Sequence, residues 1–181
     1  MGTDATETTA NLKDFIPIIS VMVGVIIGGL ISFFTTNYLE IRKQAAESKR
    51  IALAFRGEIR ALLGIIKRKK YIENFQWVIE QMEITQNKYP MHIQIRREYF
   101  LVFQNNVSNI GSLASPLPEL IAQFYVQANS VLEELESHRD GTLDNIGIPD
   151  LIESVKELRA LLQETVAIGE QIIEYIPASP K

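Results

Sequence analysis

The stretch from residue 15 to residue 34 carries no charged side chain and is rich in Ile, Val, Phe and Gly. A helix rises about 1.5 Å per residue, so this stretch would span about 30 Å, the thickness of the hydrocarbon core of a bilayer. The chain stays uncharged as far as Leu39. The pattern predicts a short extracytoplasmic tail over residues 1–14, a transmembrane helix over 15–37 and a cytoplasmic helical domain over 38–181.

A cleaved signal peptide and a buried core helix are the two alternative interpretations of this stretch. A signal peptide begins with basic residues and has a shorter apolar core, whereas this tail carries Asp4, Glu7 and Asp14 against Lys13. A core helix would need an apolar partner, but the segment that follows is amphipathic and does not require an all-round apolar neighbour. We therefore expect an uncleaved anchor.

Basic residues near the two ends of the expected span predict its direction. Arg42, Lys43, Lys49 and Arg50 follow the span, and only Lys13 precedes it. Because positive charge resists translocation, the N-terminus is expected outside and the C-terminal domain inside, as in a single-pass protein of the inner (cytoplasmic) membrane. The four residues that follow the span are then juxtamembrane anchors, and the lipid bilayer is the first expected partner.

Small side chains recur every four residues within the expected span, at Ser20, Gly24, Gly28 and Ser32. Residues four apart share one face of a helix. Helices associate in a bilayer through close backbone approach, which such small residues permit. The stripe predicts a homo-oligomer that packs through this face. Gly29 lies off the stripe, and glycine is also simply frequent in membrane helices.

Charge is divided unevenly along the expected cytoplasmic domain. Residues 38–100 contain 13 Lys or Arg and 7 Asp or Glu, whereas residues 101–181 contain 4 and 12. One interpretation is that the two halves pack together with complementary surfaces. The other is that the basic half faces anionic lipid and the acidic half faces a protein partner. Cysteine is absent, which excludes disulfides and thiolate chemistry.

Apolar residues at helical spacing predict an all-α fold, with one N-terminal transmembrane helix followed by a bundle of about four helices. In the last helix, the apolar stripe nearly follows a seven-residue repeat from Leu151 to Ile176. The predicted helices run from residue 38 toward Thr85, with a bend near Gly64 or near the basic block Lys67–Lys70, from Glu98 to Asn106, from a start at Ser115–Glu119 through Leu135, and from Pro149 to Pro177.

The connections carry turn-forming residues. An extended segment is expected around residues 92–96 and a loop over residues 105–112, which are rich in Asn, Ser and Gly. Ser115 is the expected cap of the helix that follows, because its hydroxyl can accept a hydrogen bond from a free N–H at the helix start. Asp140 and Gly141 mark a turn before the last helix.

No motif in the chain specifies a reaction. A phosphate-binding glycine loop, a zinc-protease motif and a nucleophile elbow are all missing from the sequence. Glu133, Glu134 and Glu136 near His138 could in principle hold a metal, but on an amphipathic helix they are expected to form the solvated face. We expect no enzyme activity, cofactor or metal, and the block Lys67–Lys70 is interpreted as a solvated turn rather than a nucleic-acid site.

The centre of the chain carries the pattern Tyr99-Phe100, Phe103, Asn105-Asn106, Ile110-Gly111, Leu113, Leu117-Pro118-Glu119-Leu120 and Phe124-Tyr125. It resembles uncharacterised bacterial membrane proteins in which a single N-terminal span precedes a helical cytoplasmic domain. The match covers about a sixth of the chain, and Pro116 and Pro118 are separated here. The resemblance implies a compartment and an architecture and supplies no activity.

The sequence favours a membrane-anchored interaction or scaffold module that self-associates through its transmembrane helix and docks an unknown cytoplasmic protein. The alternative is a small effector that assembles in the membrane and permeabilises it. The same glycine stripe is the reason for considering this alternative. An enzyme with its site between Tyr89 and Pro116, using His92 or Arg96 and Arg97, is a third and weaker hypothesis. The aromatic residues of the centre are expected to pack in the core, and a ligand pocket lined by them is the open alternative.

Overall fold

The computed structural model describes residues 7–89, 97–139 and 146–177, and the side chains of 28–89, 99–138 and 146–177. Over these residues the fold is all-α, with no strand. The chain divides into two compact units, Met1–Glu47 and Ser48–Lys181. Helix α1 (Glu7–Lys69) contributes to both units, and the remaining elements belong to the second.

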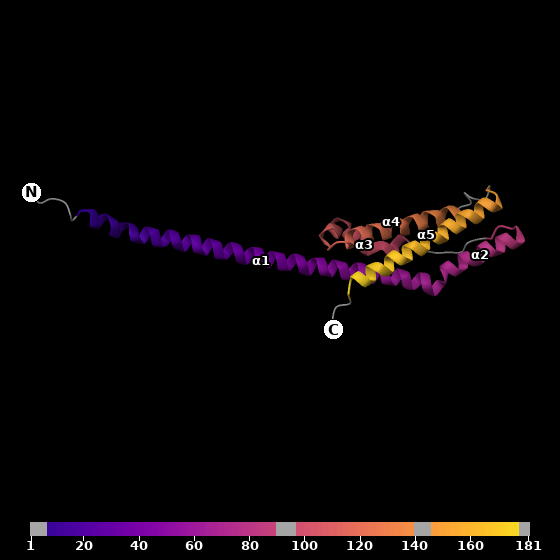
Figure 1. The fold of residues 1–181 in the computed structure, drawn as a ribbon, viewed down its shortest axis with the longest axis horizontal. Helices are drawn as coiled ribbons and strands as arrows, with labels where there is room; N and C mark the ends of the chain where they lie inside the picture. Colours follow the sequence, from indigo (N-terminus) through magenta and orange to yellow (C-terminus); the bar gives the residue numbers. More distant parts are fainter. Residues whose placement is uncertain (1–6, 90–96, 140–145, 178–181) are drawn as a thin grey trace, which may run out of the picture. The chain divides into compact units, whose positions relative to one another are not determined.

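The second unit contains four long helical segments. They are the end of α1, α2 (Tyr71–Thr85), α4 (Leu117–Arg139) and α5 (Ile148–Tyr175). Three short elements connect α2 to α4: η1 (Arg97–Phe100), α3 (Leu101–Asn106) and η2 (Val107–Ser112). Helix α5 packs against α4 and against α2 (Figure 1). The predicted all-α bundle of about four helices is confirmed.

Lys70 separates α1 from α2 at the basic block, one of the two positions at which the sequence predicted a bend; the other, Gly64, lies within α1. The backbone of Lys70 is left-handed, with φ 52° and ψ 44°, a conformation that helices commonly adopt where they end. The side-chain amide of Asn74 donates a hydrogen bond to the carbonyl of Lys69 at 3.2 Å. This bond satisfies one of the carbonyls that the end of α1 leaves without a helical partner. At the far end of α2, Gln86 is also left-handed and donates its N–H to the carbonyl of Met82.

The core of the second unit consists of two apolar clusters that follow each other along α5. One cluster joins the C-terminal half of α5 to α1 and the start of α4, through residues such as Phe55, Phe124 and Ile172. The other joins the N-terminal half of α5 to α2 and the end of α4, through residues such as Phe75, Leu135 and Leu158. Helices α1 and α2 therefore cover successive parts of the same partner helix.

The apolar stripe predicted for the last helix is buried. Its buried members are Leu151, Val155, Leu158, Leu162, Thr165, Gly169, Ile172 and Ile176. The two halves of the domain do pack together, because α2 belongs to the basic half and α5 to the acidic half. In the ion pair between them, the acidic half supplies the positive charge and the basic half the negative one: Lys156 of α5 contacts Glu83 of α2 at 2.9 Å.

Two local predictions about the connection before α4 were wrong. Residues 107–112 form the 3-10 helix η2 rather than a loop, and it buries Ile110 in the first cluster. Ser115 is not the cap of α4, because the first helical carbonyl belongs to Pro116, which accepts from the N–H of Leu120 at 3.2 Å. The extended segment expected at 92–96 and the turn at Asp140 lie outside the described residues.

Among the residues whose side chains are described, no helix has a stretch long and apolar enough to cross a membrane. The expected span, 15–37, enters that description only from Gly28 onward, and its backbone is part of α1.

Candidate functional site

The small-residue stripe of the expected span is described only in its second half. Ser20 and Gly24 lie outside the residues whose side chains are described. At Gly28, an added Cβ would meet no heavy atom within 4 Å, and Ser32 is exposed. The hydroxyl of Thr36, which continues the stripe, donates to the carbonyl of Ser32 at 2.8 Å. This face is open, and its hydroxyl at position 36 is satisfied within the helix.

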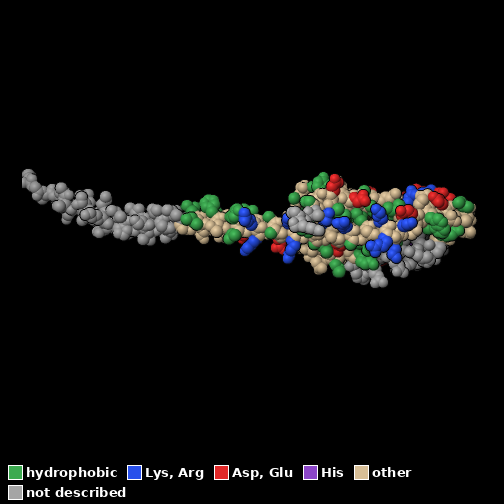
Figure 2. Space-filling model, turned by 90° about the horizontal axis from the view of Figure 1, so that it is seen from below, with side chains coloured by type: hydrophobic (Ala, Val, Ile, Leu, Met, Phe, Trp, Pro, Cys, Tyr) green, Lys and Arg blue, Asp and Glu red, His purple; other side chains and the backbone are tan. Residues whose placement is uncertain are grey.

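Large apolar side chains surround this face on the first unit. Their exposed fractions lie between 51% and 67%. Figure 2 shows apolar side chains, in green, gathered along the first part of α1 that is coloured by type. Such a contiguous exposed apolar surface is typical of a protein or membrane interaction site. The residues are Leu30, Ile31, Phe33, Phe34, Tyr38, Leu39 and Ile41.

The predicted basic anchors are all exposed and are divided between the units. In the first unit, the guanidinium carbon of Arg42 lies 4.7 Å from the centre of the Tyr38 ring, a cation–π arrangement, and Lys43 follows it. Lys49 and Arg50 belong to the second unit. Near Tyr38 the first unit thus changes from an apolar surface to a charged one, in which Arg42 and Lys43 lie among Glu40 and Glu47.

A half-buried polar junction that the sequence analysis missed joins α1 to α3 and α4. The carboxylate of Glu58 accepts the N–H of Val102 at 2.7 Å and the N–H of Phe103 at 3.2 Å, and it also accepts the hydroxyl of Tyr125. Phe100, which precedes α3, provides no side-chain cap. Glu58 therefore caps α3 from another helix, in the way an acidic residue stabilises a helix start.

Aromatic rings enclose this junction. The rings of Phe55, Phe100, Phe103 and Phe124 lie 4.1–6.1 Å from the ring of Tyr125, with Phe103 stacked on it. Burial, followed by the hydrogen bond and charge of Glu58, raises the pKa of Tyr125 well above its usual range. The phenol therefore stays protonated and remains a donor. One signal in the sequence could have revealed the junction: Glu58 interrupts the apolar stripe of α1 between Phe55 and Ile59.

A cavity of about 30 Å³ lies beside the aromatic cluster, between α1, α4 and α5. Tyr99, Phe100 and Phe124 contribute to its walls, which are otherwise almost entirely apolar. Small-molecule sites usually enclose about 300–1,000 Å³. Phe100, Phe124 and Tyr125 are buried in the core, as predicted, whereas Phe103 is half-buried and Tyr99 is 36% exposed. The cavity is too small for an organic ligand of ordinary size.

The acidic end of α4 shows a different arrangement from a metal site. Over the described part of the chain, no group of three or more His, Cys, Asp or Glu side chains converges. His138 Nε2 lies 3.3 Å from Ser154 Oγ, and burial lowers the pKa of this imidazole. Burial and the nearby Glu157 raise the pKa of Glu134. His92 and Arg96, named in the enzyme hypothesis, lie outside the described residues.

A shallow hollow of about 350 Å³ opens between α2 and α5, with Trp77 and Arg159 in its walls. The Nε atom of Arg159 is buried and has no hydrogen-bond partner among the described residues.

Comparison of the chain with protein-family models, with curated proteins and with solved structures gives no match. The function proposed below therefore depends on the residues and the geometry alone.

Proposed function

We propose that this chain is a membrane-anchored helical interaction module. Residues 15–37 cross the cytoplasmic membrane once with the N-terminus outside, and copies associate through Ser20, Gly24, Gly28 and Ser32. The unit that begins at Ser48 docks a cytoplasmic protein. Its role is that of a scaffold, and no reaction is assigned to it.

The observation that carries the proposal is the apolar surface of the first unit. Side chains such as Phe33 and Phe34 are 61% and 67% exposed, and they continue the uncharged stretch that begins at Phe15. Removing apolar surface from water is favourable by about 25 cal/mol per Å². Hydrocarbon around this helix would provide that environment, and no packing within the described residues does so.

The transition that follows this surface supports both the anchor and its direction. Tyr38 and Arg42 form a cation–π pair, and Lys43 extends the basic character. Aromatic rings favour the level of the lipid headgroups, and Lys and Arg favour the cytoplasmic side. The pair at residues 38 and 42 is therefore proposed to lie at the cytoplasmic interface.

Docking of a partner is supported by the surface of the second unit. Leu101, Val107 and Val126 are each more than half exposed. The half of the sequence that contains them, residues 101–181, carries 12 Asp or Glu against 4 Lys or Arg. A partner with a basic surface and an apolar centre would complement these features.

Membrane placement is tested on the full chain expressed in bacteria. The expected result is retention in the membrane fraction after alkaline carbonate extraction, and activity of a cytoplasmic reporter fused after Lys181. A chain that leaves the membrane without detergent, or a C-terminal reporter that is active only outside, would overturn the proposal.

Self-association is tested by substitutions on and off the stripe. Gly24→Ile and Gly28→Ile should lower dimerisation in a membrane two-hybrid assay, because a bulky side chain prevents close approach of two backbones. Gly29→Ile adds the same side chain off the stripe and is the matched control. Equal association of all three variants would contradict the proposed face. Loss of membrane potential on expression, followed with a potential-sensitive dye, would instead favour the permeabilising effector.

A further inference from the structure

The outer face of α2 carries two large apolar side chains that the domain leaves uncovered. Trp77 is 53% exposed and Ile84 is 76% exposed. Ile84 follows Trp77 by seven positions, about two helical turns, so the two side chains share one face of the helix. The ring of Trp77 meets the ring of Tyr89 edge to face, at 5.7 Å between centres. This face of α2 therefore offers apolar surface to another molecule.

The hollow beside Trp77 has groups that call for a polar and charged occupant. Glu73 and Glu80 of α2 line it together with Arg159 of α5. An occupant that brings positive charge to the two carboxylates would complement this surface.

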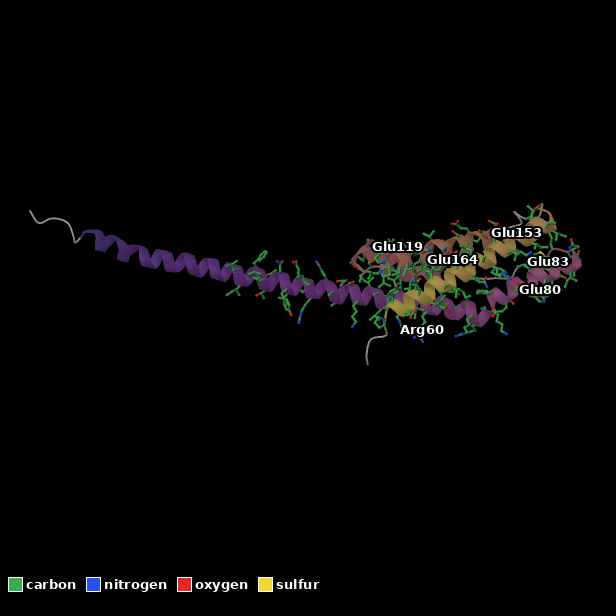
Figure 3. The ribbon with its side chains drawn as sticks, viewed as in Figure 1. Arg60, Glu80, Glu83, Glu119, Glu153 and Glu164 are labelled. Carbon is green, nitrogen blue, oxygen red and sulfur yellow. The ribbon has the colours of Figure 1, made fainter. Side chains whose placement is uncertain are left out.

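Charge changes sign along α2 and the turn before it. Lys67, Arg68, Lys69 and Lys70 are exposed at the junction of α1 and α2, and Glu73, Glu80 and Glu83 follow. Figure 3 shows Glu80 and Glu83 along α2, beyond this junction. Glu83 already pairs with Lys156, and Glu80 accepts a hydrogen bond from the side-chain amide of Gln76 at 2.6 Å. Glu73 and Glu80 border the hollow.

This order makes α2 complementary to a second, antiparallel copy of itself. In an antiparallel pair, the basic start of each helix faces the acidic part of the other. In a parallel pair, acidic residues would face acidic residues and repel. The charge pattern of the chain therefore selects both the occupant and its direction.

We propose that the hollow binds the basic turn of a second copy of this chain, through α2 helices that pack antiparallel about a twofold axis. With Lys70 of one copy opposite Glu80 of the other, the axis passes near residue 75. The two Trp77 residues are then offset by four positions, about 6 Å along the helices, so both side chains lie next to the axis. A twofold axis produces each contact twice.

This contact rests on the self-association proposed above and adds a second interface outside the membrane segment. Anchoring holds two copies at a high effective concentration, so a small contact between domains suffices to align them. The two interfaces involve different residues and can be tested separately.

The absence of cysteine from the chain allows the contact to be tested by cross-linking in the full-length protein. Two differently tagged copies are expressed together in membranes, one with Lys70→Cys and the other with Glu80→Cys. Packed helices lie about 8–10 Å apart, so a bis-maleimide of that span is added. We expect the mixed product to exceed, at least threefold, the product of Lys70→Cys with Glu119→Cys, an exposed position on α4 (Figure 3).

Equal yields in the two combinations would overturn the inference. If a Gly28→Cys cross-link between copies persists in that case, the failure concerns the α2 contact alone. If that cross-link is lost as well, the failure extends to the self-association under the proposed function.

Charge reversal distinguishes a second copy from a different basic partner. Association measured by energy transfer between labelled full-length copies in vesicles should fall about fivefold with Glu80→Lys and with Lys70→Glu, since two exposed pairs are lost in each case. The variant that carries both changes should recover, because each reversed charge again meets its opposite. Glu153→Lys on α5 is the control and should have no effect. Failure of the double variant to recover would overturn the assignment to a second copy and point to a basic segment of another protein.

Discussion

Glu58 receives hydrogen bonds from two backbone N–H groups of α3 and from the hydroxyl of Tyr125 on α4. A carboxylate with several donors in an enclosed place stabilises the fold more than an exposed ion pair does. We predict that Glu58→Gln lowers the free energy of unfolding by about 1–3 kcal/mol, because an amide oxygen replaces two charged acceptors. Chemical denaturation monitored by circular dichroism measures this change.

Tyr125→Phe removes only the hydroxyl donor and should cost less than Glu58→Gln, about 1–2 kcal/mol. The effects of the two substitutions should not add in the double variant, because they share one hydrogen bond. Tyr175→Phe removes a hydroxyl from a side chain that is 51% exposed and is the matched control. Full additivity would show that the Glu58–Tyr125 contact contributes nothing.

His138 makes the stability of the domain fall as the pH falls. Its pKa in the folded chain is lowered by burial from the ordinary value of 6.5, so above pH 7 the imidazole is neutral in both the folded and unfolded states. As the pH falls below 6.5, the unfolded chain takes up a proton that the folded chain does not, and stability is lost until the folded pKa is passed.

We therefore predict that the melting temperature of the wild type falls more between pH 7.5 and pH 5.5 than that of His138→Gln. The comparison between the two proteins removes the contribution of the carboxylates, which both share. An equal fall of the melting temperature in the two proteins over this pH range would contradict the assignment of the effect to His138.

At the scale of the elements, the packing of α5 depends on a glycine. A Cβ at Gly169 would lie 2.8 Å from a ring carbon of Phe124 and 3.2 Å from the Cγ2 methyl of Ile59. These neighbours are core side chains of α4 and α1, so either they or the helices that carry them would have to shift. We predict that Gly169→Ala destabilises the domain by about 1–3 kcal/mol.

Gly64 of α1 is the matched control for this prediction. It also lies in a helix, but an added Cβ there meets nothing within 4 Å. Gly64→Ala should therefore stabilise the domain by about 0.5–1 kcal/mol, because alanine gives the unfolded chain less conformational freedom than glycine does. In thermal melting, Gly64→Ala should raise the melting temperature and Gly169→Ala should lower it. If Gly169→Ala raised the melting temperature, α5 could not approach Phe124 closely.

Helical periodicity was sufficient to predict the long elements of this domain. The stripe of α5 and the break at Lys70 follow from residues that lie close together in the sequence, and both were confirmed. The 3-10 helix η2 was missed because Asn, Ser and Gly favour turns, and its conformation depends on burying Ile110. The Glu58 junction was missed because its partners lie 44 to 67 residues away. No local pattern encodes a contact of that kind.

At the scale of the whole molecule, the two units differ in what stabilises them. Every residue of the two core clusters lies at or beyond Ile51, within the unit Ser48–Lys181. The described residues 28–47 of the first unit contribute to neither cluster, and their large apolar side chains are exposed. Folding of the second unit therefore depends on contacts that it contains itself.

We predict that residues 48–181, expressed alone, fold into a helical domain that unfolds cooperatively and needs no detergent. Its denaturation midpoint should equal that of the same unit in the full chain, because no core side chain has been removed. A fragment that begins at Tyr71 is the control. It lacks Phe55, Glu58 and Ile59, which cover the C-terminal half of α5 and cap α3, so it should bind a hydrophobic dye and melt without a sharp transition. If residues 48–181 behaved in the same way as this control, the first unit would have to supply stability that its exposed side chains do not account for.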